Sequence, residues 1–275
     1  MLLSIITINY NNRDGLQKTI DSVITQTWKD YEWIVIDGGS TDGSKELIDK
    51  YQKHFSYWCS EPDNGVYNAM NKGIAKAKGE YLSFMNSGDT FYGVDTLNSI
   101  FCKKRTGDVL YGDCMRIYKD HKELLRYPRI MELYVLHCDP ICHQAMMIRT
   151  SLLSDSGYDE SFKVCADYKH LMDIAVHGVS FEYVGVTVCR YDMSGISSHY
   201  NDEMKREIDE AHQVIPETIR YSMEHLKSYA GNRHLVRTRL LLERGGFVAF
   251  VTKAISLFLY KIFIRKDFTD YPYFK

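Results

Sequence analysis

The sequence lacks features that are typical of several common classes of protein. No G-x-G-x-x-G motif follows its first apolar run, which argues against a dehydrogenase. The same turn, Asn9 to Arg13, also lacks the glycine-rich basic loop that a nucleotidyltransferase needs for phosphate. The 34 basic and 36 acidic residues nearly cancel, and no basic stripe interleaved with aromatics occurs in the first 200 residues. Nucleic acid is therefore not an expected partner.

The cysteines do not form a disulfide framework. There are seven, an odd number without regular spacing, and Met1 runs into the first apolar segment without a secretory leader. We therefore expect reduced thiols and a cytoplasmic location. Residues 137–143 contain two histidines and two cysteines, which are zinc-binding residue types, but a second ligand pair at suitable spacing is missing. Thiols packed as small apolar side chains are the favoured interpretation.

Short apolar runs alternate with stretches of helical periodicity. The predicted strands are Leu2–Ile8, Glu32–Ile36 and Glu80–Met85, and the predicted helices are residues 12–26, 41–51 (with Ser40 or Thr41 as N-cap) and 66–77. This βαβ pattern is typical of an α/β protein with a parallel sheet. Polar turns follow all three strands, at Asn9–Asn11, Asp37–Ser40 and Asn86–Asp89. Parallel sheets bind ligands outside the carboxyl ends of their strands, so the three turns predict one binding site for a phosphate-bearing ligand.

The rest of the chain predicts a mixed region followed by helices. Strands are expected within 108–127 and at 181–188, and residues 151–178 read as a helix, a turn and a second helix from about Ala166. Residues 191–198 read as a loop that closes over a ligand. Beyond Ser198 the composition shifts to long charged helical segments, starting with 202–214. We therefore predict a domain of residues 1–200 and a helical C-terminal region of residues 201–275.

Residues 247–264 form a predicted amphipathic helix. Lys253 and Lys261 interrupt its apolar sequence, which argues against a transmembrane span. Basic residues surround it, namely Arg233, Arg237, Arg239, Arg244, Arg265 and Lys266. This pattern predicts a helix that lies in the interface of an anionic membrane, with packing against protein as the alternative.

Six segments, in order, resemble the family 2 glycosyltransferases of GT-A fold. They are residues 4–11, 35–43, 63–73, 79–81 with 86–89, 142–144 and 166–168. The blocks 79–81, 86–89, 142–144 and 166–168 look most similar to the bacterial polysaccharide branch of colanic-acid type. The resemblance covers about residues 1–200. It implies a GT-A fold with a mostly parallel sheet flanked by helices. It also implies inverting transfer of a hexosyl or N-acetylhexosaminyl group from a nucleoside-diphosphate sugar to a saccharide acceptor, lipid-linked, in surface polysaccharide synthesis. Such an enzyme would be peripheral at the cytoplasmic face of the membrane.

The resemblance also implies roles on the donor side. Asp37 would bind the base, Thr7 and Asn9 would line the nucleotide pocket, and Asp63 would lie beside the ribose or base. Asn86, Ser87, Gly88 and Asp89 stand where the family carries its Asp-x-Asp element. Asp89 is the best remaining ligand for Mg²⁺ or Mn²⁺, with the amide oxygen of Asn86 as a weaker one. Two alternatives stay open. One is a mechanism that needs little metal, and the other is a purely structural role in which Asp89 caps a helix that starts near Thr90.

On the acceptor side, Asp167 matches the family's catalytic base, although Ala166 replaces the usual glutamate. Taken alone, this aspartate would read as a helix cap. His143 and Gln144 would face the sugar or diphosphate, with a structural histidine as the alternative, and Tyr168 would either stack on an acceptor ring or pack in the core. Because the Asp-x-Asp element is degraded, a non-catalytic scaffold that retains the fold is the competing hypothesis, with a nucleotidyltransferase as a further one.

Overall fold

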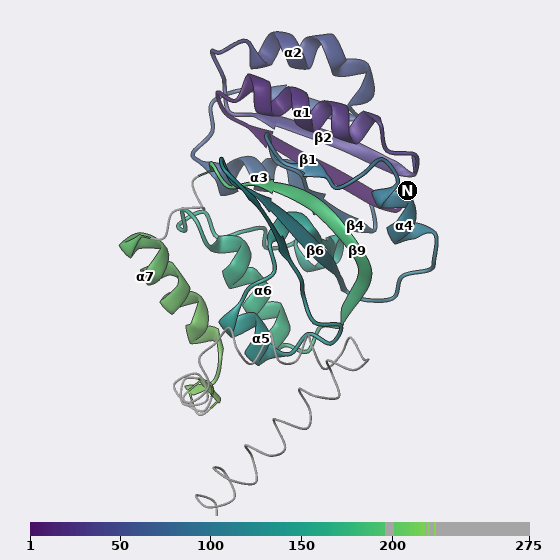
Figure 1. Ribbon diagram of the computed structural model, residues 1–275. Coiled ribbons are helices and arrows are strands. Elements are labelled where there is room, and N and C mark those ends of the chain that lie inside the picture. The colour runs from purple at the N-terminus through teal and green to yellow at the C-terminus, as the bar shows by residue number, and fades with distance from the viewer. Residues whose placement is uncertain (196–200, 218, 221–222, 224–275) are drawn as a thin grey trace, which may run out of the picture. The chain divides into compact units, whose positions relative to one another are not determined.

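The computed structural model describes residues 1–195, 201–217, 219–220 and 223 (Figure 1). Residues 1–223 form one compact unit. The predicted helix 247–264 and residues 196–198 of the predicted loop lie outside the described residues. Within the described part, no helix combines the length and apolar character needed to cross a bilayer.

The N-terminal half is built of parallel strands. They are β1 (Leu3–Asn9), β2 (Tyr31–Asp37), β3 (Tyr57–Ser60) and β4 (Tyr81–Phe84), in the order β3-β2-β1-β4. The connecting helices are α1 (Arg13–Ile24), α2 (Ser44–Tyr51), the short 3₁₀ helix η1 (Gln52–His54) and α3 (Val66–Ile74). Strand β1 is buried along its whole length, which explains its continuous apolar sequence. The predicted βαβ arrangement is therefore confirmed.

The sheet continues from β4 through β8 (Met146–Arg149), β6 (Val109–Ile117), β9 (Phe181–Asp192) and β5 (Thr90–Phe91), with β7 (Lys122–Leu125) paired to β6. Strand β8 is antiparallel to β4 and β6, whereas β6 and β9 are parallel. The remaining helices are α4 (Thr96–Phe101), α5 (Leu133–Cys138), α6 (Ala166–Val176), α7 (Asp202–Ala211), and the 3₁₀ helices η2 (His143–Ala145), η3 (Thr150–Leu152) and η5 (His212–Val214). The result is a mixed sheet whose N-terminal strands are all parallel.

Local sequence explains how the first helices pack. In α1, Leu16, Ile20 and Val23 recur at helical spacing and are buried. The Asn12 side chain caps this helix by accepting a hydrogen bond from the Gly15 backbone N–H. Helix α3 packs on β1 and β2, and its Gly73 permits this approach because a Cβ there would lie 2.5 Å from Ile6 Cγ2.

Helix α7 packs on α6 although it lies beyond residue 200 (Figure 1). Its buried Glu207 accepts hydrogen bonds from the backbone N–H groups of Lys163, Val164 and Cys165, at 2.7, 2.9 and 2.8 Å. These three residues lead directly into α6. The division of the chain at residue 200 stays a prediction, and α7 contributes to the position of α6.

Some predicted elements differ in the structure. The helix expected from Ser151 is only the 3₁₀ turn η3, because the chain then turns at Gly157 with a φ of 62°. No helix begins at Thr90, where the short strand β5 pairs with β9. Helix α2 has Gly43 as its N-cap rather than Ser40 or Thr41. Strand β3 was not predicted, because its four residues are all only partly buried and carry no clear apolar pattern.

Candidate active site

Asp37, at the end of β2, is the centre of a polar cluster. Its Oδ1 accepts hydrogen bonds from Asn9 Nδ2 at 2.7 Å and Ser40 Oγ at 2.6 Å, and its Oδ2 accepts from Ser60 Oγ at 2.6 Å and the Ser40 backbone N–H at 3.0 Å. Burial works to raise the pKa of Asp37, but the hydrogen bonds from Ser40, Ser60 and Asn9 together lower it below its ordinary value. Asp37 is thus held ionised in a fixed orientation.

Asn9 joins this cluster to the turn after β4. Its Oδ1 accepts a hydrogen bond from Ser87 Oγ at 2.7 Å, and Asn12 Nδ2 donates to the Ser87 carbonyl at 3.0 Å. Asn11 has the left-handed φ of 47° and donates its backbone N–H to Ser40 Oγ at 2.7 Å. The turns after β1, β2 and β4 therefore meet at one edge of the sheet, as the sequence predicts.

Asp63 lies against the turn that follows Asp37. A Cβ at Gly38 would lie 2.5 Å from Asp63 Oδ2 and 3.1 Å from Tyr10 Cδ2, so only glycine lets these groups approach. The Asp63 Oδ1 accepts a hydrogen bond from the Gly65 backbone N–H at 2.9 Å, just before α3. Tyr10 is 67% exposed. A carboxylate and an exposed aromatic ring thus flank the same glycine.

Thr7 does not belong to this polar edge. It is fully buried, its hydroxyl donates to the Met85 carbonyl at 2.8 Å, and it accepts a hydrogen bond from Trp33 Nε1 at 3.0 Å. The expectation that Thr7 lines a nucleotide pocket is therefore corrected: its side chain fixes β1 to β4 and to Trp33 on β2. Successive side chains of β1 point to opposite faces of the sheet. The sequence could not show that Trp33 covers the face on which Thr7 lies.

Asp89 lies inside the protein rather than at its surface. Only 4% of the residue is exposed, its Oδ1 accepts from the Asp192 backbone N–H at 2.9 Å, and its Oδ2 accepts from Gln144 Nε2 at 2.9 Å. Burial raises the pKa of Asp89 to about 7. Asp89 is therefore not a helix cap; it fastens the end of β9 and the η2 segment to the turn after β4.

The turn that carries Asp89 is poor in ligands for a cation. Each Asp89 oxygen already accepts one hydrogen bond from the protein, and burial raises the pKa of this carboxyl to about 7, so it is only partly ionised near neutrality. Gly88, with a φ of 105°, supplies no ligand, although Asp192 Oδ2 would lie 3.5 Å from a Cβ there. The buried Asn86 Oδ1 has no hydrogen-bond partner within the described residues. Apart from Asp89, Asp192 brings a carboxylate close to this turn, and no step below depends on a cation.

Asp167, in the first turn of α6, is held by two side chains from distant segments. Tyr67 on α3 donates its hydroxyl to Asp167 Oδ1 at 2.8 Å, and His143 Nδ1 lies 3.1 Å from Asp167 Oδ2. Burial works to raise the pKa of Asp167, but His143 and then Tyr67 lower it below its ordinary value. Burial works to lower the pKa of His143, yet Asp167 raises it above its ordinary value. The pair therefore favours an ionised carboxylate beside a protonated imidazole.

His143 and Gln144 connect the two parts of the site. They are adjacent in η2: His143 contacts Asp167, and Gln144 contacts Asp89. His143 also packs edge-on against Phe84, the last residue of β4, and its Nε2 is buried with no hydrogen-bond partner in the described part of the chain. A continuous set of contacts thus runs from Asp167 through η2 to Asp89 and the turn after β4.

Tyr168 packs in the core instead of facing an acceptor. It is 8% exposed, and its hydroxyl lies 3.2 Å from the Leu136 carbonyl and 2.8 Å from His212 Nε2. This corrects its assignment as a site residue. Adjacent helical residues point about 100° apart, so Tyr168 faces α5 and η5 while Asp167 faces α3.

Several residues of this site were not singled out from the sequence. Ser40 and Ser60 bind Asp37, Tyr67 binds Asp167, and Asp192 binds Asp89 through its backbone. Tyr67 lies within a segment that carries the family resemblance, so that resemblance could have indicated it. Ser60 and Asp192 lie in strands without a recognisable motif, and only pairing in the sheet brings them into contact.

Comparison with known proteins identifies the family. Residues 4–153 match the family model described as glycosyl transferase family 2. An uncharacterised glycosyltransferase of Mycobacterium tuberculosis strain H37Rv is 35% identical over 205 residues, which cover 72% of this chain and 77% of that protein. A glycosyltransferase of PGL/p-HBAD biosynthesis from Mycobacterium bovis is 28% identical over 212 residues, covering 74% of this chain and 81% of that protein.

Solved structures show the same fold. Staphylococcus aureus TarS 1–349 in complex with UDP-GlcNAc matches with a TM-score of 0.62 and 19% identity, covering 81% of this chain and 70% of that one. The mannosyltransferase PcManGT from Pyrobaculum calidifontis, solved with GDP-Man and Mn²⁺, matches with a TM-score of 0.55 and 15% identity, covering 97% and 82%. The predicted GT-A fold is confirmed.

Proposed function

Because this chain belongs to glycosyltransferase family 2, we propose that it is an inverting transferase that moves a sugar from a nucleoside-diphosphate sugar to a saccharide acceptor. The acceptor we propose is lipid-linked, and the product is a cell-surface polysaccharide or glycolipid. The name of the M. bovis relative, which places it in PGL/p-HBAD biosynthesis, supports a surface glycoconjugate. The transferred group we propose is a hexosyl or N-acetylhexosaminyl unit. The comparisons support the class of surface glycoconjugates and not the colanic-acid type specifically.

The observation that carries this proposal is the arrangement around Asp167. An inverting transferase needs a base that takes the proton of the acceptor hydroxyl as its oxygen attacks the anomeric carbon. Asp167 has a lowered pKa, so it is ionised at neutral pH, and Tyr67 and His143 fix its two oxygens. The general base is Asp167, and Tyr67 and His143 position it. Its contacts through η2 with the turn after β4 support a position on the donor's side of the sheet.

The donor's nucleotide would occupy the edge formed by the turns after β1 and β2. Asp37 is ionised but fully buried with four protein hydrogen bonds, so in this proposal a base N–H replaces one of its serine donors. Asp63 would offer a carboxylate to the ribose on the other side of Gly38. Tyr10, which is 67% exposed beside Gly38, provides a face on which a base stacks. Asn9 and Ser87 hold these turns together.

We propose that Asp89 acts as a structural anchor rather than as the metal ligand. The PcManGT structure holds Mn²⁺ with GDP-Man. In this chain an amide and a glycine replace two carboxylates of the Asp-x-Asp element, and Asp89 is committed to Gln144 and the Asp192 backbone. If Mg²⁺ or Mn²⁺ takes part, Asp192 and Asn86 are the residues whose oxygens remain for it, and the ion would neutralise the diphosphate.

The proposed location is the cytoplasmic face of the membrane. The sequence of residues 247–264, amphipathic and flanked by basic residues, supports attraction to anionic lipid. A lipid-linked acceptor gives a reason for a transferase to stay at that surface.

The test is donor binding and turnover with a panel of UDP-, GDP- and dTDP-sugars, by calorimetry and by release of the nucleoside diphosphate. One donor should bind, Asp37→Asn should weaken its binding, and Asp167→Asn should bind it normally but lose about 10²- to 10⁴-fold in turnover. Asp209→Asn, at an exposed position of α7, is the matched control and should behave as wild type. Binding of a donor without any turnover in the presence of acceptor membranes would favour the non-catalytic scaffold instead.

A further inference from the structure

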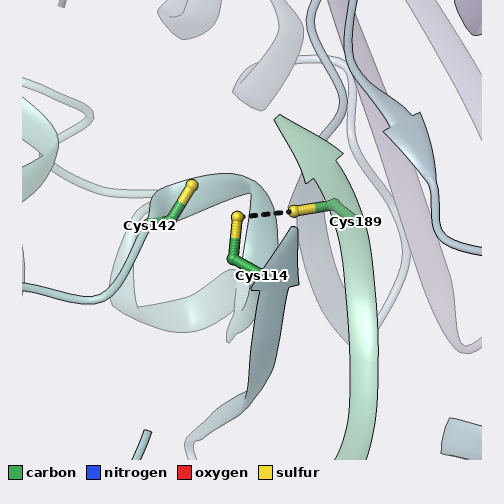
Figure 2. Close-up of side chains that lie close together, drawn as sticks. All are labelled: Cys114, Cys142 and Cys189. Atoms are coloured by element: carbon green, nitrogen blue, oxygen red, sulfur yellow. Dashed lines mark hydrogen bonds between the residues drawn. The ribbon is translucent and has the colours of Figure 1, made fainter. Parts of the chain in front are cut away.

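Three cysteines that are distant in the sequence converge inside the protein (Figure 2). Cys114 lies on β6, Cys142 immediately precedes η2, and Cys189 lies on β9. Their three Sγ atoms all lie within 4.8 Å of one another, and the Cys189 thiol donates to Cys114 Sγ at 3.6 Å. Cys114 and Cys189 are fully buried, whereas Cys142 is partly buried. Three soft ligand atoms thus share one small volume.

The sheet itself fixes two of the three thiols. Cys114 and Cys189 are direct partners in the parallel β6–β9 pair, so their side chains leave the same face of the sheet. The third thiol comes from the loop before η2, whose position is set when the Cys142 backbone N–H donates to the buried Tyr127 hydroxyl at 2.7 Å. The cluster therefore depends on rigid elements rather than on mobile side chains.

The distances suit a thiophilic metal ion. Zinc binds thiolate sulfur at about 2.3 Å with tetrahedral angles, so sulfur atoms around it lie about 3.8 Å apart. The Cys114–Cys189 separation of 3.6 Å is already close to this value, and the remaining pairs need to close by at most about 1 Å. Thiolates prefer such soft or borderline ions over Mg²⁺ or Mn²⁺.

A partly buried arginine beside the cluster favours thiolates over thiols. Arg116 lies two residues after Cys114 on β6 and interacts electrostatically with Cys114 and Cys142. Its Nε is buried and has no hydrogen-bond partner within the described part of the chain. An unpaired guanidinium N–H in the interior is stabilised by a negative charge next to it. Arg116 Nη1 already lies 3.7 Å from Glu123 Oε2, and three metal-bound thiolates would add a second source of negative charge near the guanidinium.

We propose that Cys114, Cys142 and Cys189 form a three-thiolate site for a thiophilic divalent ion, with Zn²⁺ as the ion bound in the cell. Binding displaces the three thiol protons, and the fourth ligand is water or Gln144 Oε1, which already lies 3.0 Å from Cys142 Sγ. The ion would fasten the segment that carries His143 and Gln144 to β6 and β9. It is a structural site that goes beyond the proposed transfer reaction and does not depend on it.

The experiment uses the full chain, reduced and freed of metal with a chelator, and titrates it with Co²⁺. A single Co²⁺ per chain should bind with a sulfur-to-cobalt charge-transfer band, and Zn²⁺ should displace it. Loading with Zn²⁺ should also raise the melting temperature. The band should be lost in Cys189→Ala and in Cys142→Ala, since two thiols do not form the site.

Two control variants make the result specific. Cys102→Ala removes an exposed thiol, and Cys138→Ala removes the other cysteine of the 137–143 segment; both should bind Co²⁺ as wild type does. If Cys189→Ala does not fold, Cys142→Ala still tests the site because that thiol is only partly buried.

Three results would overturn the proposal. One is wild-type protein without a charge-transfer band, and another is a band that persists in Cys142→Ala. The third is a Cys114–Cys189 disulfide, found by mass spectrometry in protein prepared without reductant, together with failure of the reduced chain to take up an ion.

Discussion

At the scale of single residues, the same side-chain type serves opposite purposes in this protein. Asp37 and Asp167 are buried carboxylates whose hydrogen bonds outweigh the cost of burial, so both have a lowered pKa. Asp89 is buried with fewer hydrogen bonds, and its pKa is raised to about 7. The number and charge of the donors around each group therefore decide whether it is an ionised site residue or a largely neutral anchor.

The raised pKa of Asp89 predicts a specific pH dependence of stability. Its pKa moves from 3.8 to about 7 on folding, so its contribution to stability is complete below about pH 4 and is lost as the pH rises through 7. Compared with Asp89→Asn, which cannot ionise, the wild type should lose up to about 1.4 kcal/mol of unfolding free energy per pH unit across this window. Urea unfolding at pH 5 and pH 8 measures the difference. Asp155→Asn, at an exposed position, should show no such trend. If the unfolding free energies of wild type and Asp89→Asn differ by the same amount at both pH values, the assignment is refuted.

Removal of the Tyr67 hydroxyl should change the pH profile of catalysis. In Tyr67→Phe, Asp167 loses a hydrogen bond that favours its charged form, so its pKa should rise and the acid limb of the kcat/KM profile should move to higher pH with it. Turnover at pH 8 should change little. Tyr158→Phe is the matched control, because the buried Tyr158 hydroxyl has no hydrogen-bond partner within the described residues. An unshifted acid limb in Tyr67→Phe would show that Asp167 is not the titrating base.

At the scale of elements, the position of the base depends on a helix that the sequence assigned to the C-terminal region. Glu207 on α7 accepts three backbone hydrogen bonds from residues 163–165, directly before α6 and only two residues before Asp167. An acidic side chain near a helix N-terminus is also favourable for the helix dipole. Helix α7 is therefore part of the support for the active site.

Glu207→Gln should weaken this support. The glutamine side chain has an N–H donor where glutamate has a second acceptor oxygen, so at least one of the buried backbone N–H groups loses its hydrogen-bond partner. This loss should lower the unfolding free energy by about 1–3 kcal/mol. We also expect lower kcat with nearly unchanged donor binding, because α6 shifts while the turns after β1 and β2 do not. The measurements are the unfolding free energy from chemical denaturation and the steady-state kinetics of Glu207→Gln. Glu210→Gln, at an exposed position of the same helix, is the control. Wild-type stability in Glu207→Gln would show that these contacts are dispensable.

At the scale of the whole molecule, the prediction concerns membranes. The charge reversals Lys253→Glu and Lys261→Glu in the full chain should weaken binding to vesicles that contain phosphatidylglycerol, because each lysine near an anionic surface contributes about 1 kcal/mol. Both together should cost roughly 30-fold or more in affinity. Vesicle sedimentation at low and high salt measures this, with neutral phosphatidylcholine vesicles as control. Equal sedimentation of wild type and variant would favour packing against protein instead.

The sequence by itself determined the parallel strands β1, β2 and β4, the three polar turns and the position of Asp167 at the start of a helix, because apolar periodicity and strand ends are local properties. It also carried the family resemblance, which depends on the order of short segments. Only the tertiary structure decided that Thr7 and Tyr168 belong to the core, that Asp89 points inward, and that Tyr67 and Glu207 support Asp167. It also brought Cys142 to Cys114 and Cys189 instead of to its neighbours in the 137–143 segment. These outcomes depend on which strands pair and which face each side chain takes, and such long-range contacts leave no local pattern in the sequence.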